Sequence, residues 1–270
     1  MSPPPGLRIF AKGNVDVRDS LLWSRVNGQV GWNGLNQLFR EQGRRQVARI
    51  RHETAIGFDF IPLPDRPAPA IAPELLAHLP AGESYPLAQQ RQTALFEKPA
   101  DLVVLSLQPD LMNQLALHRA SASKFYPEYA DRWGPAARDW FARECAPGGL
   151  SAVDDAMAAL ERLLDAIDER LRAAVLVYNI CPIVPGERIP SYLGAGDALA
   201  LRAKRLNLAL AELSTQRDFS IVDLERLSAS AGAARLKVDM LHFTDEGWRL
   251  IAEEVARIAG ERGLLDGAAA

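Results

Sequence analysis

The chain has 270 residues and a mass of 29.6 kDa, with 48 % hydrophobic and 24 % charged residues, a composition typical of a globular protein with a sizeable core. Its 31 Lys and Arg residues against 34 Asp and Glu residues give a net charge of −3, so no strong positive field attracts a nucleic-acid backbone. We therefore exclude a general nucleic-acid-binding protein.

Short apolar runs alternate with amphipathic stretches, a pattern typical of β-α units that build a parallel sheet. The predicted strands cover residues 7–12, 45–51, 101–107, 173–180 and 219–222. Several of them are rich in Val, Ile and Leu, as expected for strands that helices cover on both faces. The sequence therefore predicts a three-layer α/β/α fold.

Three later stretches repeat apolar residues at helical spacing. The first begins after Ser151, a residue type that favours the N-cap position, and the second covers 197–213. The last covers 245–259, where the Thr244 side chain can cap the first turn. These spacings predict three amphipathic helices, each with one face toward the sheet.

Two stretches break the alternation and are predicted to be loop insertions. Residues 61–73 contain five prolines, and residues 121–149 mix aromatic residues, prolines and glycines. Neither stretch has the composition of a linker between domains. We predict one α/β domain over residues 1–262 with these two insertions, followed by a tail at 263–270.

No residue pattern predicts a metal or a cofactor. Cys145 and Cys181 stand apart from any metal-ligand or redox spacing, and the four histidines are scattered along the chain. No glycine-rich phosphate loop follows a predicted strand. The sequence also lacks a secretory signal pattern and an apolar run of membrane-spanning length. We expect a cytoplasmic protein with no membrane partner.

An acid–base pair precedes the last predicted helix. Asp239 lies three residues before His242, so its carboxylate can hold one imidazole nitrogen and leave the other to take a proton from a nucleophile. In the structural alternative, His242 packs at the start of the helix while Asp239 caps a turn. Spacing alone leaves both interpretations open.

The position of this pair resembles the last motif of the SGNH, or GDSL-type, hydrolases. The sequence at 239–247 reads Asp-Met-Leu-His-Phe-Thr-Asp-Glu-Gly, with Gly247 in the fifth place after His242. The resemblance implies a flavodoxin-like parallel sheet. It also implies that Asp239 and His242 complete a catalytic triad with a serine located shortly after the first strand.

The expected Gly-Asp-Ser-Leu motif is altered in this chain. Arg18-Asp19-Ser20-Leu21 carries Arg in the glycine position, and this alignment makes Ser20 the nucleophile. The competing alignment matches Gly-Asp-Ser to Gly13-Asn14-Val15, which removes the nucleophile. We predict Ser20.

The resemblance also implies donors for the oxyanion of an acyl-transfer intermediate. The backbone N–H of Ser20 is one, and Gly57, after the second strand, loosely matches another. The asparagine expected after the third strand is replaced, because the chain reads Gln108-Pro109-Asp110 there. Gln108 can donate through its amide, whereas an ionised Asp110 would repel an oxyanion.

Polar residues near the predicted strand ends are candidates for substrate binding. Arg51 ends the second strand and can hold a carboxylate or a phosphate with two hydrogen bonds. In the structural alternative, the second strand is an edge strand whose arginines are solvated. Asn14, in the charged segment 12–19, and Asp110 are the other two candidates.

These observations predict an SGNH-like hydrolase or acyltransferase that works through a Ser20–His242–Asp239 triad. Its substrate would be a small polar ester or thioester, anionic if Arg51 contacts it. The hypothesis from a different class is a catalytically silent SGNH-like fold that binds a ligand or a partner protein. In that case Ser20 would point away from His242.

Overall fold

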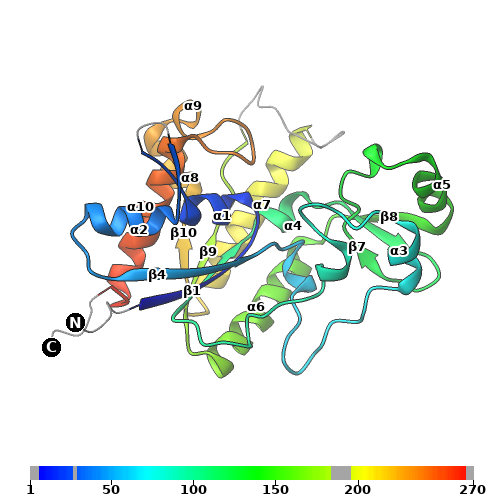
Figure 1. The fold of residues 1–270 in the computed structure, drawn as a ribbon, viewed down its shortest axis with the longest axis horizontal. Helices are drawn as coiled ribbons and strands as arrows, with labels where there is room; N and C mark the ends of the chain where they lie inside the picture. Colours follow the sequence, from blue (N-terminus) through cyan, green and yellow to red (C-terminus); the bar gives the residue numbers. More distant parts are fainter. Residues whose placement is uncertain (1–5, 27–28, 184–195, 266–270) are drawn as a thin grey trace.

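The computed structural model describes residues 6–26, 29–183 and 196–265 (Figure 1). Its central sheet has five strands in the order β10-β9-β5-β1-β4, and every neighbouring pair is parallel. The strands are β1 (Gly6–Lys12), β4 (Val47–Glu53), β5 (Leu102–Ser106), β9 (Ala174–Tyr178) and β10 (Ser220–Val222). All five predicted strands are present, and the predicted α/β sheet is confirmed.

Side chains that alternate along the strands divide the core into two layers. In β5, Leu102 and Val104 pack into the first layer, while Val103 and Leu105 pack into the second. Five helices cover the first face: α1 (Val15–Leu22), α2 (Gly34–Glu41), α8 (Leu224–Ala231), α9 (Ala233–Leu236) and α10 (Asp245–Glu261). The second face is covered by α4 (Gln108–Met112), α6 (Val153–Arg170) and α7 (Gly196–Ser214), together with the turn η1 (Phe58–Phe60). The fold therefore has the expected three layers.

Of the two helix N-caps predicted from the sequence, the structure contains one. Thr244 caps α10, because its hydroxyl accepts a hydrogen bond from the Gly247 N–H at 3.1 Å. Helix α6 starts after Ala152 without a side-chain cap, so the prediction that Ser151 is its N-cap is wrong. The long apolar face of α6 provides its stability instead.

The predicted insertion at 121–149 is a folded lobe, drawn to the right of the sheet in Figure 1. Strands β7 (Lys124–Phe125) and β8 (Cys145–Gly149) both pair with β6 (Leu115–His118), and α5 (Pro135–Glu144) connects them. Helix α3 (Pro73–His78) packs on the same small core. The expectation of an irregular loop was wrong here because two- to five-residue strands give too little periodicity to detect.

The remaining described elements are short. Strands β2 (Trp23–Val26) and β3 (Gln29–Trp32) form an antiparallel hairpin between α1 and α2. The turn η2 (Leu87–Gln89) precedes β5. No helix in the described part of the chain is apolar enough over its length to cross a bilayer.

Candidate functional site

A cavity of about 160 Å³ lies beyond the carboxyl ends of β1, β4 and β5, where ligands bind in open parallel sheets. We call it the His242 cavity. The sheet domain contributes Asn14, Val15, Arg18, His52, Thr54, Gln108, Met112, Asn113, Leu241 and His242, and the lobe with its preceding loop contributes Ser84, Tyr85, Tyr126, Glu128 and Tyr129. Most of the lining residues are of polar types, but more of the surface that they present to the cavity is apolar, with three tyrosines on the lobe side.

Asp239 and His242 are in direct contact at one wall of this cavity. His242 Nδ1 lies 2.9 and 3.0 Å from the two carboxylate oxygens of Asp239. The His242 side chain is 47 % exposed and that of Asp239 16 %. The carboxylate therefore holds Nδ1, and Nε2 is the nitrogen left for chemistry.

The turn around Asp239 keeps its carboxylate ionised. Asp239 accepts hydrogen bonds from the backbone N–H groups of Leu241 at 2.7 Å and His242 at 2.8 Å. Burial alone would raise the pKa of Asp239, but the hydrogen bonds from the His242 ring and from these two N–H groups outweigh it and lower that pKa. An ionised Asp239 fixes the tautomer and orientation of the ring.

The glycine of the same motif has a packing role. A Cβ at Gly247 would lie 2.3 Å from the carbonyl oxygen of Leu236, which also accepts a hydrogen bond from the Thr244 N–H at 2.8 Å. Only glycine allows α10 to begin this close to the end of α9. The motif at 239–247 therefore builds the turn that holds His242.

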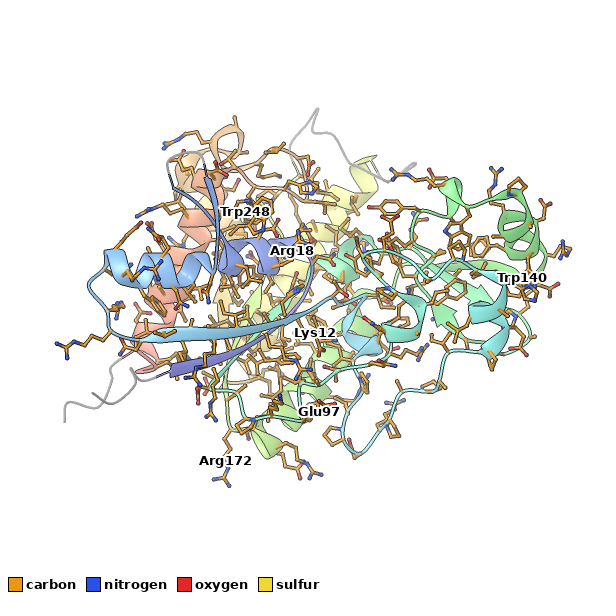
Figure 2. The ribbon with its side chains drawn as sticks, viewed as in Figure 1. Lys12, Arg18, Glu97, Trp140, Arg172 and Trp248 are labelled. Atoms are coloured by element: carbon orange, nitrogen blue, oxygen red, sulfur yellow. The ribbon has the colours of Figure 1, made fainter. Side chains whose placement is uncertain are left out.

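The opposite wall is the start of α1. Gly13 lets this helix approach β5, because a Cβ there would lie 2.7 Å from Ser106 Cβ. Asn14, Val15 and Arg18 then line the cavity, and Arg18 is labelled in Figure 2. The buried Asn14 amide oxygen accepts a hydrogen bond from the Tyr85 hydroxyl, which links the sheet domain to the lobe. Asn14 therefore lines the cavity, and its contact with a substrate stays a prediction.

Ser20 lies in the core, which contradicts its predicted role as the nucleophile. It is only 1 % exposed and is not among the residues that line the cavity. Its Oγ lies 3.0 Å from the Tyr178 hydroxyl and 3.2 Å from the Val17 carbonyl oxygen. The physical reason is helical phase: Ser20 is five residues beyond Val15, about 140° around a helix with 3.6 residues per turn.

The predicted oxyanion donors are separated as well. Gln108 lines the cavity and is 6 % exposed, and its amide oxygen has no hydrogen-bond partner among the described residues. Gly57 is not in the lining, and a Cβ there would lie 2.9 Å from an Asp110 carboxylate oxygen. Its φ of 153° also favours glycine. Gly57 therefore makes room for Asp110, and of these two residues only Gln108 reaches the cavity.

Asp110 does not line the His242 cavity, so its predicted contact with substrate is not supported. Its carboxylate accepts the Phe58 N–H at 3.1 Å and is fully enclosed. Burial raises the pKa of Asp110 to about 7, although the Phe58 hydrogen bond opposes this shift. Asp110 anchors the turn after β4.

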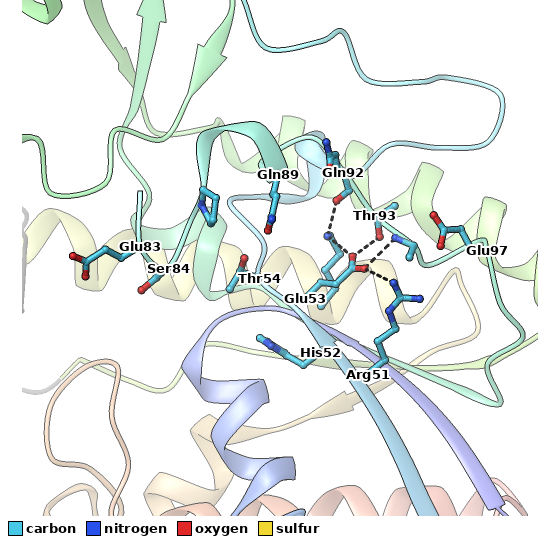
Figure 3. A pocket seen from close by; sticks show the side chains of 13 residues that line it. Arg51, His52, Glu53, Thr54, Glu83, Ser84, Gln89, Gln92, Thr93 and Glu97 are labelled. Atoms are coloured by element: carbon cyan, nitrogen blue, oxygen red, sulfur yellow. Dashed lines mark hydrogen bonds and ion pairs between the residues drawn. The ribbon is translucent and has the colours of Figure 1, made fainter. Parts of the chain in front are cut away.

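Arg51 lines a neighbouring, larger cavity of about 520 Å³, which we call the Glu53 cavity (Figure 3). Its guanidinium lies 3.7 Å from Glu53 and 5.9 Å from the Phe10 ring centroid. Strand β4 is the edge of the described sheet and extends two residues beyond its predicted end, so that His52 and Glu53 belong to it. Arg51 lines the Glu53 cavity and is not in the lining of the His242 cavity.

Sequence reasoning missed the contribution of the lobe. Glu128 is 5 % exposed, and its carboxylate accepts hydrogen bonds from the backbone N–H groups of Glu83, Ser84 and Tyr85 at 2.8 to 3.1 Å. These bonds hold the loop that carries Tyr85 against the cavity. The aromatic residues of 121–149 were the only available signal, and their order in the chain does not say which of them face the sheet.

No family model matches this chain, and no curated protein matches its sequence. Among solved structures it is similar to a GDSL-like lipase from Bacteroides thetaiotaomicron (TM-score 0.52, 10 % identity, 94 % of this chain and 88 % of that one). It is also similar to an acetyl xylan esterase from Geobacillus stearothermophilus (0.52, 11 %, 96 % and 97 %) and to an aryl esterase from M. smegmatis (0.50, 14 %, 96 % and 100 %).

The chain has the fold of the SGNH hydrolases. Identities of 10 to 14 % show a divergent form of this fold and carry no information about activity. The resemblance at 239–247 thus extends to the whole described architecture.

Proposed function

We propose that this protein is a hydrolase that cleaves a small polar ester in the His242 cavity, with His242 as the general base. The observation that carries the proposal is the Asp239–His242 pair, in which a carboxylate 2.9 Å from Nδ1 leaves Nε2 for proton transfer, in a residue that lines the His242 cavity. Asp239 also caps the turn, as the structural alternative expected, and the same carboxylate holds the ring. The cytoplasm remains the predicted compartment.

The mechanism proposed here uses water as the nucleophile, since Ser20 lies in the core. His242 Nε2 takes a proton from a water molecule while the water oxygen forms a bond to the ester carbonyl carbon. The C–O bond to the leaving group then breaks, and the imidazolium returns the proton to the leaving oxygen. The Gln108 amide, which lines the same cavity, is the proposed donor to the oxyanion.

Hydrolysis of p-nitrophenyl acetate tests this proposal. We expect His242→Ala to lower kcat/KM by about 10²- to 10⁴-fold, the usual contribution of general acid–base catalysis. His78→Ala is the matched control, because His78 is also exposed and lies outside the cavity. Equal rates in the wild type and in His242→Ala would refute the proposal.

One observation favours a second function, the binding of a polar ligand without turnover. Val15 is the first residue of α1 and lines the cavity with His242, so an aliphatic side chain occupies the wall from which a serine would attack. Under both functions we expect that a fluorophosphonate probe does not label the folded wild type. Absence of ester hydrolysis in the wild type would favour the binding protein.

A further inference from the structure

The Glu53 cavity adjoins the His242 cavity. His52, Thr54 and Ser84 line both of them. Figure 3 shows His52, Glu53 and Thr54 at the end of β4, facing Glu83 and Ser84 on one side and Gln92 and Thr93 on the other. A ligand too large for the first cavity, which holds about 160 Å³, would therefore reach the second, which holds about 520 Å³.

The positive charges of the Glu53 cavity are already paired. Lys12 is 4 % exposed, and its Nζ lies 3.0 Å from Glu53 Oε2 and 3.2 Å from the Gln92 carbonyl oxygen. Arg51 lies 3.7 Å from the same carboxylate. Glu53 also accepts hydrogen bonds from the Thr93 hydroxyl and the Ala94 N–H. Both cations are thus directed at Glu53.

His52 adds no charge at the junction of the two cavities. Its Nε2 lies 3.2 Å from the Gly13 carbonyl oxygen, and a carbonyl can only accept, so Nε2 carries the proton. Burial lowers the pKa of His52 to about 4, although the hydrogen bond to Gly13 opposes this. The neutral ring leaves Nδ1 as an acceptor.

The rest of the lining disfavours an anion. The carboxylates of Glu83 and Glu97 line the cavity without a hydrogen bond or ion pair to any described side chain. Two cations against three carboxylates give an excess of one negative charge. Gln89, Gln92, Thr54 and Ser84 each offer both a donor and an acceptor.

We propose that the Glu53 cavity is a second subsite, which binds an uncharged part of the substrate rich in hydroxyl and amide groups while the ester lies at His242. The inference rests on the proposed function for the position of the ester. The proposed substrate is uncharged at this subsite, unlike the anionic substrate that the position of Arg51 in the sequence favoured. Recognition depends on neutral donor–acceptor pairs, since both the buried Lys12 and the half-exposed Arg51 are already paired with Glu53.

The test compares three probes of similar size: N-acetylglucosamine (neutral), glucuronate (anionic) and glucosamine (cationic). Each is titrated into uniformly ¹⁵N-labelled full-length protein, and amide shifts are followed by NMR. We expect N-acetylglucosamine to shift the Thr54, Thr93 and Ala94 amides and to bind at least tenfold more tightly than glucuronate. Tighter binding of glucuronate, or of glucosamine by tenfold, would overturn the proposal.

A pair of variants locates the binding. Gln92→Leu should weaken N-acetylglucosamine binding at least fivefold, because it removes a donor and an acceptor from the cavity wall. Gln216→Leu is the matched control, an exposed glutamine outside both cavities. Unchanged affinity in Gln92→Leu would contradict the subsite.

These measurements separate the subsite from the proposed function. Binding is read without turnover, so N-acetylglucosamine binding in a protein that hydrolyses no ester supports the subsite and rejects the hydrolase. Ester hydrolysis that depends on His242, without probe shifts at Thr93 and Ala94, supports the hydrolase and rejects the subsite. His242→Ala should retain the probe shifts.

Discussion

The two walls of the His242 cavity differ in how closely they match the catalytic site that the sequence predicted. At the C-terminal wall, Asp239 contacts His242 at 2.9 Å, and Gly247 and Thr244 build the turn that presents the ring. At the N-terminal wall, helix α1 presents Val15 and Arg18 to the cavity. The predicted Asp239–His242 contact is present, while no hydroxyl of the described α1 is in the cavity lining.

This difference comes from the geometry of the two segments. Asp239 and His242 belong to one tight turn, where a spacing of three residues fixes their contact. Ser20 lies one and a half turns into a helix, where phase decides which face a side chain joins. Ser20 lies on the buried face of α1 with Asp16, four residues earlier. Val15 lies with Arg18 on the face that lines the cavity.

The largest effect is expected at the C-terminal wall. Asp239→Asn should lower kcat/KM for p-nitrophenyl acetate by about a hundredfold or more, because an amide can donate to Nδ1 and stabilise the wrong tautomer. The far-UV circular dichroism spectrum should not change. Asp131→Asn, at an exposed aspartate outside the cavity, is the control. A loss of less than threefold would mean that Asp239 does not orient the base.

The N-terminal wall should gain reactivity when it receives a hydroxyl. We expect Val15→Ser to react with a fluorophosphonate probe at position 15, because this position and His242 line the same cavity. Mass spectrometry of tryptic peptides would locate the label. The label should disappear when His242→Ala is added. A variant that stays unlabelled would show that position 15 is out of reach of Nε2.

Ser20→Ala should affect stability and leave activity within twofold of the wild type. The change removes the hydrogen-bond partner of the buried Tyr178 hydroxyl, which costs about 1–3 kcal/mol of unfolding free energy. Urea denaturation followed by tryptophan fluorescence measures this cost. If esterase activity is lost while the fold is stable, Ser20 takes part in the reaction after all.

The smallest effect concerns stability, and it depends on the pH through Asp110, which anchors the turn after β4. The pKa of Asp110 rises from 3.8 to about 7 in the fold, so between these values the folded state holds a proton that the unfolded chain releases. The stability from this group therefore falls as pH rises from about 4 to about 7. Asp110→Asn should raise the melting temperature by a few degrees at pH 8 and less at pH 4.5. Calorimetry showing equal gains at both would contradict a buried, protonated Asp110.

Much of this protein was predictable from local patterns. The five strands, the helices on 153–170 and 245–261 and the Asp239–His242 contact each depend on residues within a few positions of one another. Period-two burial places Val103 and Val104 on opposite faces of β5, and a single turn places a carboxylate on an imidazole. Local spacing decides such features because the backbone dihedrals leave few alternatives.

The remainder needed the tertiary structure. Whether Ser20 or Val15 faces His242 depends on where α1 begins after β1, and Gly13 allows that start by its close approach to Ser106. The contributions of Tyr85 and Glu128 depend on a lobe that packs against the sheet domain across long sequence separations. Contacts between distant segments arise from packing of the whole core, which no local pattern specifies.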